Sequence, residues 1–331
     1  MSKKSVTIKE IADIAGVSVA TVSYVLNGKK KISEKTRTKV LAIVQQLNYT
    51  PNLSAQNLRT QDSKLVFALV NSINSSFNTE ILAKIDQKFD SRGYQLLTLT
   101  GKIPEVIRTN IFDGGIVLNY NLSFDDLEDL ARHVHKKMVI LSGSTPLKSA
   151  SIVSMDNESG MTLILEELYK SPHKRICFIC GPSESINNQE RLAISEKIFK
   201  SLFQRDDFSI HVYNGFFNSD AAYEVALKLM KSDSYDAFVC FNDSMALGVY
   251  QAAAELGLKI GEDISVTGFD NIFFSRHLTP GLTTVAIDKD SWAEAVVETY
   301  LAFNDENHEP TITKIPASLK KRKSIQLRDN T

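Results

Sequence analysis

The residue types that most often carry catalytic or metal chemistry are few in this chain. The C-x-x-C of "RICFICG" has no second Cys or His pair, so buried reduced thiols are favoured over a metal or redox site. The three cysteines are Cys177, Cys180 and Cys240. The six histidines are scattered, and no G-x-G-x-x-G, G-x-x-x-x-G-K-[ST] or H-E-x-x-H occurs. We therefore expect no enzyme activity, no catalytic residue, no metal and no cofactor.

Polar residues that follow apolar segments indicate a different chemistry. Asn242 ends the segment "VCFN" and Asp270 ends "VTGFD", while Asp243 is expected to cap the next helix. Amide and carboxylate groups suit hydroxyl groups, which both donate and accept hydrogen bonds. These residues predict a binding site at the ends of strands.

Length and charge indicate how the elements around such a site are divided. A chain of 331 residues exceeds one simple core. Residues 1–60 hold ten Lys or Arg against three Asp or Glu, a balance of +7, whereas the remainder holds 28 against 36, a balance of −8. A basic segment on an acidic body predicts a polyanionic partner for that segment, although an ordinary basic surface would have the same charge.

The chain carries no targeting signal that the sequence makes visible. No apolar run approaches the roughly 20 residues of a membrane span, and the first residues, "MSKKSVTIKE", lack the apolar core of a signal peptide. We expect a cytoplasmic protein.

Three short helices are predicted in the basic segment. Thr7 and Glu10 form a capping-box pair ahead of apolar residues at helical spacing. These residues are Ile8, Ile11, Ile14 and Ala15. The ends and caps expected for this helix and the next two are Gly16, Ser18, Asn27-Gly28 and Ser33. Three short helices with a three-residue turn between the first two form the helix-turn-helix plan.

The second helix, residues 19–26, is rich in small and apolar side chains. Val17, Val22 and Leu26 are expected to face inward. The outer face would then hold Val19, Ala20, Ser23 and Tyr24. Small outward residues at a helix N-terminus permit close approach to base edges and phosphates in a major groove. A three-helix bundle without a nucleic-acid role is the alternative.

This segment resembles the DNA-binding head of the lactose-repressor (LacI/GalR) family of bacterial transcription regulators. The resemblance is carried by A-x-x-A-G-V-S-x-A-T-V-S, then N-Y-x-P-N and A-x-x-L. It implies that Val19, Ala20 and Tyr24 face bases, while neighbouring groups hold phosphates. Tyr24 replaces an Arg of many members, a residue suited to reading guanine. The DNA-binding residues expected are Thr7, Ser18, Val19, Ala20, Thr21, Ser23, Tyr24, Asn27, Asn52, Ala55, Leu58 and Arg59.

Residues 51–64 are expected to form a hinge helix and linker after the head of residues 1–50. Pro51 breaks the preceding helix and Asn52 can cap a new one, which is too short to be stable alone. The resemblance implies that it folds when two copies pair in the minor groove. Leu58 would then be wedged between base steps, with Arg59 along the groove. A plain linker is the alternative.

From residue 65 onward, short apolar strands alternate with amphipathic helices, which predicts an α/β core with parallel, doubly wound sheets. The strands expected are "LVFALV", "YQLLTL", "GGIVLN", "MVILS", "RICFICG", "FSIHVYNG", "AFVCF" and "ISVTGFD". Eight strands favour two lobes, the first at about 65–155 and 287–310 and the second at about 156–284 and 311–331. This core resembles the two-lobed periplasmic sugar-binding protein fold, with a ligand cleft at the strand ends.

The resemblance also implies residues that bind an effector in this cleft. Arg191 and Asp270 stand at the family's effector-binding arginine and aspartate, and Phe217 stands where the family places a ring under the ligand. Ser185 and Asn187 stand where purine-responsive relatives carry Arg and Thr, which disfavours a purine. The effector-binding residues expected are Ser75, Phe77, Asn187, Arg191, Phe217, Asn242 and Asp270.

These features predict a homodimeric repressor of carbohydrate-utilisation genes, bound to pseudo-palindromic operator DNA. A small effector, a sugar or sugar phosphate, would control its operator affinity allosterically. A dimer is expected because no tetramer-forming helix follows "KKRKSIQLRDNT". Two alternatives are a solute-binding transport component of the same core fold and a regulator that responds to a partner protein. The basic head and the absence of an export signal argue against transport.

Overall fold

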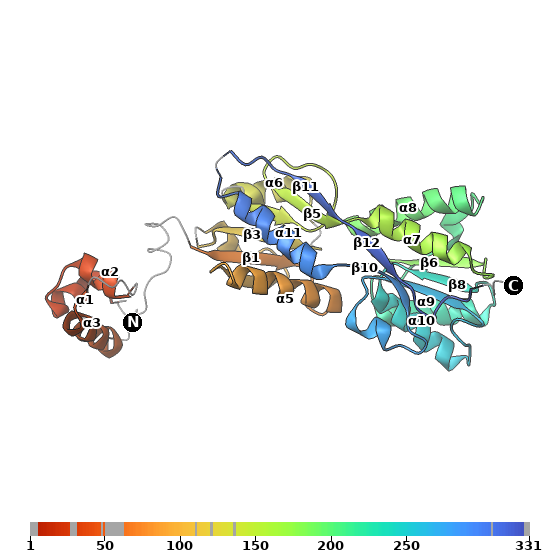
Figure 1. The fold of residues 1–331 in the computed structure, drawn as a ribbon, viewed down its shortest axis with the longest axis horizontal. Coiled ribbons are helices and arrows are strands. Elements are labelled where there is room, and N and C mark those ends of the chain that lie inside the picture. The colour runs from red at the N-terminus through yellow and green to blue at the C-terminus, as the bar shows by residue number, and fades with distance from the viewer. Residues whose placement is uncertain are drawn as a thin grey trace. The chain divides into compact units, whose positions relative to one another are not determined.

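The computed structural model describes residues 6–26, 32–47, 49, 63–109, 111–119, 122–134, 137–305 and 307–327. The chain divides into two compact units, Met1–Ser63 and Lys64–Thr331, called the head and the core below (Figure 1). No helix within these described ranges is long and apolar enough to cross a membrane.

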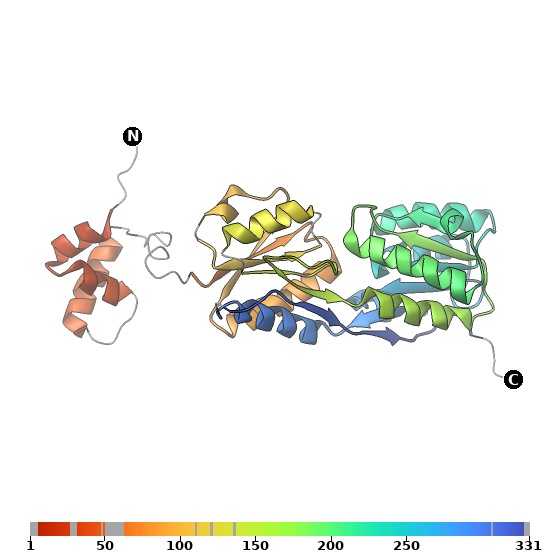
Figure 2. The same cartoon turned by 90° about the horizontal axis from the view of Figure 1, so that it is seen from above.

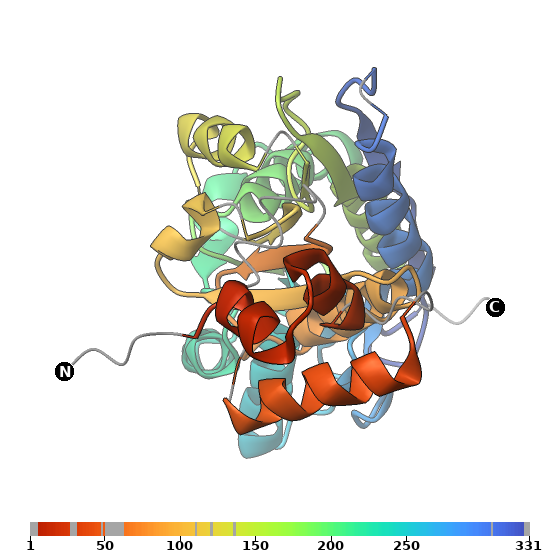
Figure 3. The ribbon, with the colours of Figure 1, turned by 90° about the vertical axis from the view of Figure 1, so that its left-hand side faces the viewer.

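Three helices form the head: α1 Ile8–Ala15, α2 Val19–Leu26 and α3 Glu34–Gln46 (Figure 3). The hydroxyl of Thr7 accepts the amide of Glu10 and the carboxylate of Glu10 accepts the amide of Thr7, which confirms the predicted capping box. Gly16 ends α1 with a φ of 65°, a left-handed conformation that glycine adopts without strain. The other predicted N-caps that are found are Ser18 for α2 and Ser33 for α3.

A small apolar core holds the three head helices together. Its buried members are Ile11, Ala12, Ala15, Val22, Val25 and Val40. The predicted outward direction of Ser23 is wrong, because Ser23 is 3% exposed. Ile14, an apolar residue at helical spacing, is 57% exposed. Ser23 lies beside Val22 on the buried face of α2, which packs against both α1 and α3. Helix α1 also packs against both other helices, but it buries Ile11, Ala12 and Ala15, and Ile14 lies off that face.

The core contains two six-stranded sheets, one in each lobe (Figures 1 and 2). The first sheet has the order β11-β5-β4-β3-β1-β2 and is parallel. Its strands are β1 Leu65–Val70, β2 Gln95–Thr100, β3 Gly114–Leu118, β4 Met138–Ile140, β5 Ser151–Met155 and β11 Ile312–Ile315. The second has the order β12-β10-β9-β8-β6-β7, with β12 antiparallel to β10 and the other pairs parallel. Its strands are β6 Ile176–Cys180, β7 Val212–Asn214, β8 Ala237–Cys240, β9 Ser265–Phe269, β10 Thr283–Ile287 and β12 Ala317–Lys320.

Helices cover both faces of each sheet. They are α5 Ser76–Asp90, α6 Phe124–His133, α7 Asn157–Tyr169, α8 Ile186–Leu202, α9 Ser219–Lys231, α10 Asp243–Glu255 and α11 Lys289–Ala302. In the first lobe Val66 and Ala68 share a cluster with α5 and α11, whereas Phe67 and Leu69 share one with α6. In the second lobe, α7 and α8 lie on one side of the sheet and α9 and α10 on the other (Figure 1). The doubly wound α/β prediction is confirmed, since parallel sheets are covered on both faces.

The chain passes between the lobes three times, from β5 to α7, from β10 to α11 and from β11 to β12. The first two crossings carry Asp156 and Asp288, each of which caps the helix that follows. The third lies at Pro316, between β11 and β12. The lobe boundary expected at residue 311 is wrong, because β11 pairs with β5 in the first sheet.

Other strand predictions also differ from the structure. Four strands, β5, β10, β11 and β12, were not among those predicted. The segment "FSIHVYNG" begins with a 3₁₀ turn, Phe208–His211, and only then forms the short β7. Its alternation of apolar and polar residues fits either element, so the pattern alone did not separate them.

Candidate nucleic-acid interface and effector cleft

The exposed surface of the head includes the start of α2. Val19 and Tyr24 are 39% and 43% exposed, and Ser18 and Ala20 are exposed beside them. The Ser18 hydroxyl lies 2.9 Å from that of Thr21 and accepts the Thr21 amide at 3.1 Å. Helix α2 contains no charged residue, so no side chain within it opposes the positive end of its dipole. This end of α2 can therefore receive a phosphate, and its small side chains allow close approach to bases.

The other residues predicted to bind DNA differ in their surroundings, and some lie outside the described residues. Ser23 is buried, so it lies inside the head and not on the surface expected of it. Thr7 is exposed and takes part in the cap of α1. Five others lie outside the described residues: Asn27, Asn52, Ala55, Leu58 and Arg59.

The second candidate site lies where strands of the core end between the two lobes. Arg191, on α8, and Asp270, after β9, come together there, with Nη2 and Oδ1 3.8 Å apart. Both residues are buried, at 3% and 7% exposure. The guanidinium Cζ also lies 3.6 Å from the centre of the Phe269 ring. Its N–H groups donate to Asn157 Oδ1 at 2.9 Å, to Met155 Sδ at 2.9 Å and to the carbonyl oxygen of Phe241.

Burial changes the protonation of this pair. Desolvation raises the pKa of Asp270 to about 7, against the opposing effect of Arg191. Desolvation also lowers the pKa of Arg191 to about 10, which leaves it cationic at neutral pH. The separation of 3.8 Å is too long for a hydrogen bond, and the Asp270 carboxylate accepts none from any other described residue. Its lone pairs are therefore available to a ligand hydroxyl.

Five asparagine side chains connect the lobes through hydrogen bonds, and are called the asparagine chain below. Its members are Asn71, Asn78 and Asn119 in the first lobe and Asn157 and Asn187 in the second. Asn187 Nδ2 donates to Asn119 Oδ1 across the lobes at 2.8 Å. Asn119 then donates to Asn78 at 2.9 Å, and Asn157 donates to Asn187 at 3.0 Å. Such a chain offers both donors and acceptors to hydroxyl groups.

Asn242 and Phe217 meet at another part of the second lobe. Asn242 Oδ1 caps α10 by accepting the Met245 amide at 2.8 Å, and its Nδ2 donates to the Phe217 carbonyl at 3.3 Å. The Phe217 ring packs directly over Gly181, where a Cβ would come within 2.3 Å of the ring. Glycine at the end of β6 thus makes room for this ring beside Asn242.

Asp243 does not cap α10, contrary to its predicted role. It is buried and faces the interior, where its carboxylate accepts the Ile272 amide at 2.9 Å and the hydroxyls of Ser275 and Thr284. Burial raises the pKa of Asp243 to about 6, although these donors oppose the change. Asn242 is the N-cap instead, because it directly precedes the helix and has the extended backbone of an N-cap residue, whereas Asp243 is already the first helical residue.

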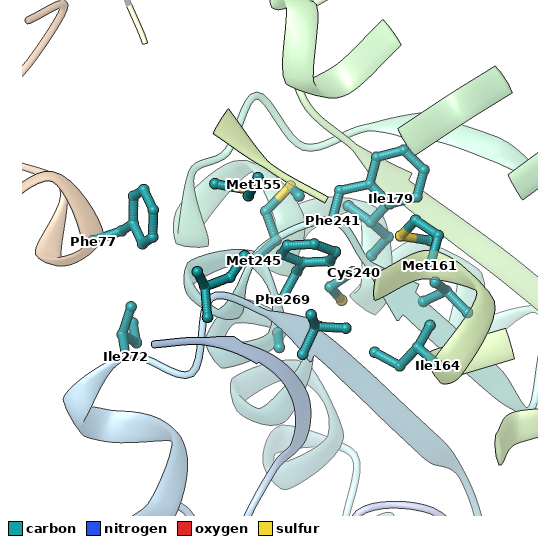
Figure 4. Packing of buried hydrophobic residues seen from close by; sticks show 14 of the residues in the cluster. Phe77, Met155, Met161, Ile164, Ile179, Cys240, Phe241, Met245, Phe269 and Ile272 are labelled. Atoms are coloured by element: carbon teal, nitrogen blue, oxygen red, sulfur yellow. The ribbon is translucent and has the colours of Figure 1, made fainter. Parts of the chain in front are cut away.

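Ser75 and Phe77 lie at the start of α5. Ser75 caps this helix by accepting the Asn78 amide at 3.3 Å. Phe77 is 5% exposed and packs against Trp292, with ring centres 5.8 Å apart. Figure 4 shows Phe77 and Ile272 at one edge of an apolar cluster that continues through the second lobe. Phe77 is therefore a core residue at the junction of the lobes.

Four members of the asparagine chain were not predicted from the sequence: Asn71, Asn78, Asn119 and Asn157. Asn119, like Asn71, carried the same signal as Asn242, an Asn directly after a buried apolar strand. It also has a φ of 49°, a left-handed conformation that asparagine tolerates better than most residues. Asn78 and Asn157 lie in first helical turns, where nothing local marks the direction of the side chain.

The cysteines are all free and buried. Burial raises the pKa of Cys180 to about 11 and the pKa values of Cys177 and Cys240 well above the ordinary value. Within the described part of the chain, no group of three His, Cys, Asp or Glu residues could hold a metal ion.

Comparison with known proteins places the chain in a family. The family described as bacterial regulatory proteins, lacI family, matches residues 7–52, and the periplasmic binding protein-like domain matches residues 165–325. The HTH-type transcriptional repressor PurR of Pasteurella multocida is 30% identical over 335 residues, covering 97% of this chain and 99% of the relative. PurR of Vibrio vulnificus is 31% identical over 334 residues, covering 97% and 98%.

Solved structures agree with this assignment. A lac repressor dimer bound to operator and the anti-inducer ONPF has a TM-score of 0.78 and 27% identity, covering 98% of this chain and 100% of that one. The lac repressor bound to ONPG in the repressed state has a TM-score of 0.79 and 28% identity, covering 97% and 100%. The chain belongs to the lacI family of bacterial regulatory proteins and is a DNA-binding transcriptional repressor, not an enzyme.

Proposed function

We propose that this repressor controls carbohydrate-utilisation genes and that a sugar or sugar phosphate in the interlobe cleft sets its affinity for the operator. The observation that carries the proposal is the set of polar groups where the two lobes meet. A buried Asp270 with open lone pairs lies beside Arg191, and amide groups of the asparagine chain lie between the lobes. This set of donors and acceptors suits a molecule with several adjacent hydroxyls.

The proposed effector contacts follow from these positions. Arg191 and Asp270 would bind neighbouring hydroxyls, and Asn187 would exchange its bond to Asn119 for bonds to the ligand. Asn242 and the Phe217 ring would form a second wall, since the apolar C–H face of a sugar can stack on a ring. Ser75 and Phe77 would position α5 at the cleft, because one caps the helix and the other is in the core.

The proposed DNA contacts use the exposed part of the head. Val19, Ala20 and Tyr24 would face bases, and Ser18 and Thr21 would hold phosphates at the N-terminus of α2. The other proposed contacts are Thr7, Asn27, Asn52, Ala55, Leu58 and Arg59. Ser23 is left out because its side chain is buried in the head.

We infer a homodimer on a two-fold symmetric operator. The lac repressor that this chain resembles was solved as a dimer bound to operator. The chain also has exposed apolar side chains, which a second copy would cover. These are Ile73, Leu247, Phe273 and Phe274, each more than 40% exposed. Effector binding would change the angle between the lobes and so shift the paired first lobes and hinge segments.

A thermal-shift series tests the effector. The probes are glucose, galactose and ribose, the corresponding sugar phosphates, and hypoxanthine as a purine control. We expect a sugar or sugar phosphate to raise the melting temperature of the wild type and not that of Asp270→Ala, since binding stabilises the native state. A shift that Asp270→Ala leaves unchanged would place the ligand elsewhere, and a response to hypoxanthine alone would replace the carbohydrate assignment.

A further inference from the structure

The turn that carries Asp270 has a strained backbone. This turn, called the Asp270 turn, comprises residues 270–273, between β9 and a 3₁₀ turn at Phe273–Arg276. Asp270 and Asn271 have φ values of 107° and 46°. Residues other than glycine rarely adopt this region, and they do so where surrounding contacts hold them. The contacts that hold this turn come from both lobes.

Two side chains of the second lobe form hydrogen bonds with the turn. Asp243 accepts the Ile272 amide at 2.9 Å, as described above. Arg322, after β12, donates from Nη2 to the Asn271 side-chain oxygen at 2.7 Å. Both contacts stay within one lobe, so they are independent of the angle between the lobes.

Glu80, on α5 of the first lobe, holds the same turn across the junction. Its Oε1 accepts the Phe273 amide at 3.0 Å, and its Oε2 accepts Lys289 Nζ at 2.7 Å. Lys289 in turn donates to the carbonyl oxygens of Asp270 and Asn271 at 3.2 and 3.4 Å. One carboxylate therefore contacts the turn directly and also through a lysine.

The charge of Glu80 matters because Lys289 is nearly buried. The Lys289 side chain is 9% exposed, against 32% for Glu80. Lys289 is also the first residue of α11, where the helix dipole disfavours a cation. Without Glu80, the ammonium would keep two carbonyl oxygens and the Phe77 ring 5.6 Å away. Asp270 and Asp243 also interact electrostatically with Lys289. Glu80, however, is the carboxylate paired with Lys289 in direct contact. Loss of that partner is unfavourable for a nearly buried cation, so Lys289 would be drawn away from the turn.

We propose that Glu80 is a positioning residue of the effector cleft: it reaches from the first lobe and fixes the second-lobe turn that presents Asp270. The turn is then fully held when the lobes are closed and loses the Glu80 contacts when they separate. This inference rests on the proposed role of Asp270 as an effector-binding residue, and it adds a link between that residue and the lobe angle.

The test compares three variants of the full-length protein. Glu80→Ala removes both contacts. Glu80→Gln keeps an oxygen for the Phe273 amide but loses the charge that faces Lys289, and it is conservative enough to preserve the fold. The matched control is Lys84→Met, which breaks the 2.8 Å ion pair between Lys84 and Asp290. That pair also joins α5 to α11 but does not touch the Asp270 turn.

Two measurements are made on each protein. Hydrogen exchange is followed by mass spectrometry in peptides that cover residues 270–276, without ligand. We expect exchange there to increase about tenfold or more in Glu80→Ala and less in Glu80→Gln, as for the loss of hydrogen bonds to a charged group. Lys84→Met should match the wild type. Affinity is measured for whichever of glucose, galactose, ribose or their phosphates binds the wild type, and we expect a weakening of about tenfold in Glu80→Ala.

The outcomes are distinguishable. If exchange at residues 270–276 in Glu80→Ala equals that in Lys84→Met, Glu80 does not hold the turn and the proposal is wrong. If exchange rises but affinity stays at the control value, Glu80 is structural and does not position Asp270 for the effector. If no sugar or sugar phosphate binds the wild type, the carbohydrate effector is wrong, and the exchange result alone decides whether Glu80 holds the turn.

Discussion

At the scale of single residues, Asp270 shows how the neighbours of a carboxylate decide its protonation. Arg191 lies close by, yet its N–H groups donate to Asn157, Phe241 and Met155 instead of Asp270. Desolvation of Asp270 is therefore stronger than its attraction to Arg191, and its pKa rises to about 7. A ligand hydroxyl that donates to this carboxylate would favour the charged form.

This raised pKa gives a pH-dependent stability. The folded pKa of about 7 lies above the ordinary value of about 4, so the native state binds more protons than the unfolded state between these pH values. The contribution of Asp270 to the free energy of unfolding is then largest below pH 4 and falls as the pH rises to 7. The free energy of unfolding of Asp270→Asn, measured relative to that of the wild type, should therefore increase from pH 5 to pH 8. We expect this increase to be on the order of 2–4 kcal/mol.

Urea unfolding of both proteins at pH 5 and pH 8 measures this increase. Asp243 also has a raised pKa, of about 6, and its charge is one cause of the raised pKa of Asp270. Comparison with the wild type at each pH therefore reports the loss of Asp270 together with this coupling. An equal difference between the two proteins at both pH values would show that Asp270 does not titrate in this window.

The residues of the site were only partly predictable. Arg191 and Asp270 lie side by side, and Asn187 is linked to Arg191 through Asn157, whereas Asn242 caps a helix and contacts Phe217 instead. Their role in binding an effector stays a prediction. The hydrogen bond between Asn119 and Asn187 joins residues in different lobes, so no local pattern could indicate it. The same holds for Glu80 and the Asp270 turn.

At the scale of elements, local chemistry predicted the helix ends well and the strands less well. The caps at Thr7, Ser18 and Ser33 depend on residues three positions apart, and the structure contains them. Strands β11 and β12 are recognisable as strands only through their partners, β5 and β10, which are more than a hundred and about thirty residues away. Ile315 is the one buried residue in these two strands, so they lack the buried apolar run of neighbouring strands such as β5 and β10.

The crossing of α9 and α10 gives an element-scale prediction. A Cβ on Gly248 would lie 2.1 Å from the Ser219 carbonyl oxygen and 2.7 Å from the Tyr223 nitrogen, both backbone atoms. We expect Gly248→Ala to lower the free energy of unfolding by about 2–4 kcal/mol, because the helices must move apart.

Gly93→Ala is the matched control for this crossing. Gly93 has a φ of +77°, and a Cβ added there would meet nothing within 4 Å, so its substitution adds backbone strain without a clash. We expect a loss of about 1 kcal/mol. Equal losses from urea unfolding of the two variants would mean that α9 and α10 are not held at this close distance.

At the scale of the whole molecule, substitutions in the asparagine chain can test which hydrogen bonds keep the two lobes together. Asn119→Ala removes the bond to Asn187 between the lobes and the bond to Asn78 within the first lobe. Asn71→Ala removes a bond of the same kind within the first lobe alone. We expect the first variant, and not the second, to increase the population of separated lobes, because each lost bond contributes about 1 kcal/mol.

Spin labels measure this population. They are placed at Asp125 on α6 and Glu196 on α8, two exposed positions in different lobes. Pulsed electron resonance should then show longer distances for Asn119→Ala and the wild-type distribution for Asn71→Ala. Identical distributions in all three proteins would mean that other contacts hold the lobes, such as the bond from Ser144 to Glu190.

The third crossing between the lobes has a consequence for how the protein is made. Strands β11 and β12 form the outer edge of one sheet each, and both are translated after residue 311. Until β11 and β12 emerge from the ribosome, the backbone N–H and C=O groups along one side of β5 and of β10 have no strand to pair with. The residues of β5 and β10 are buried in the finished core, so another chain could pair with these edges. The head is continuous in sequence and can fold early, whereas both lobes wait for the same final segment. A nascent chain that stops before residue 311 is therefore exposed to aggregation in two places at once.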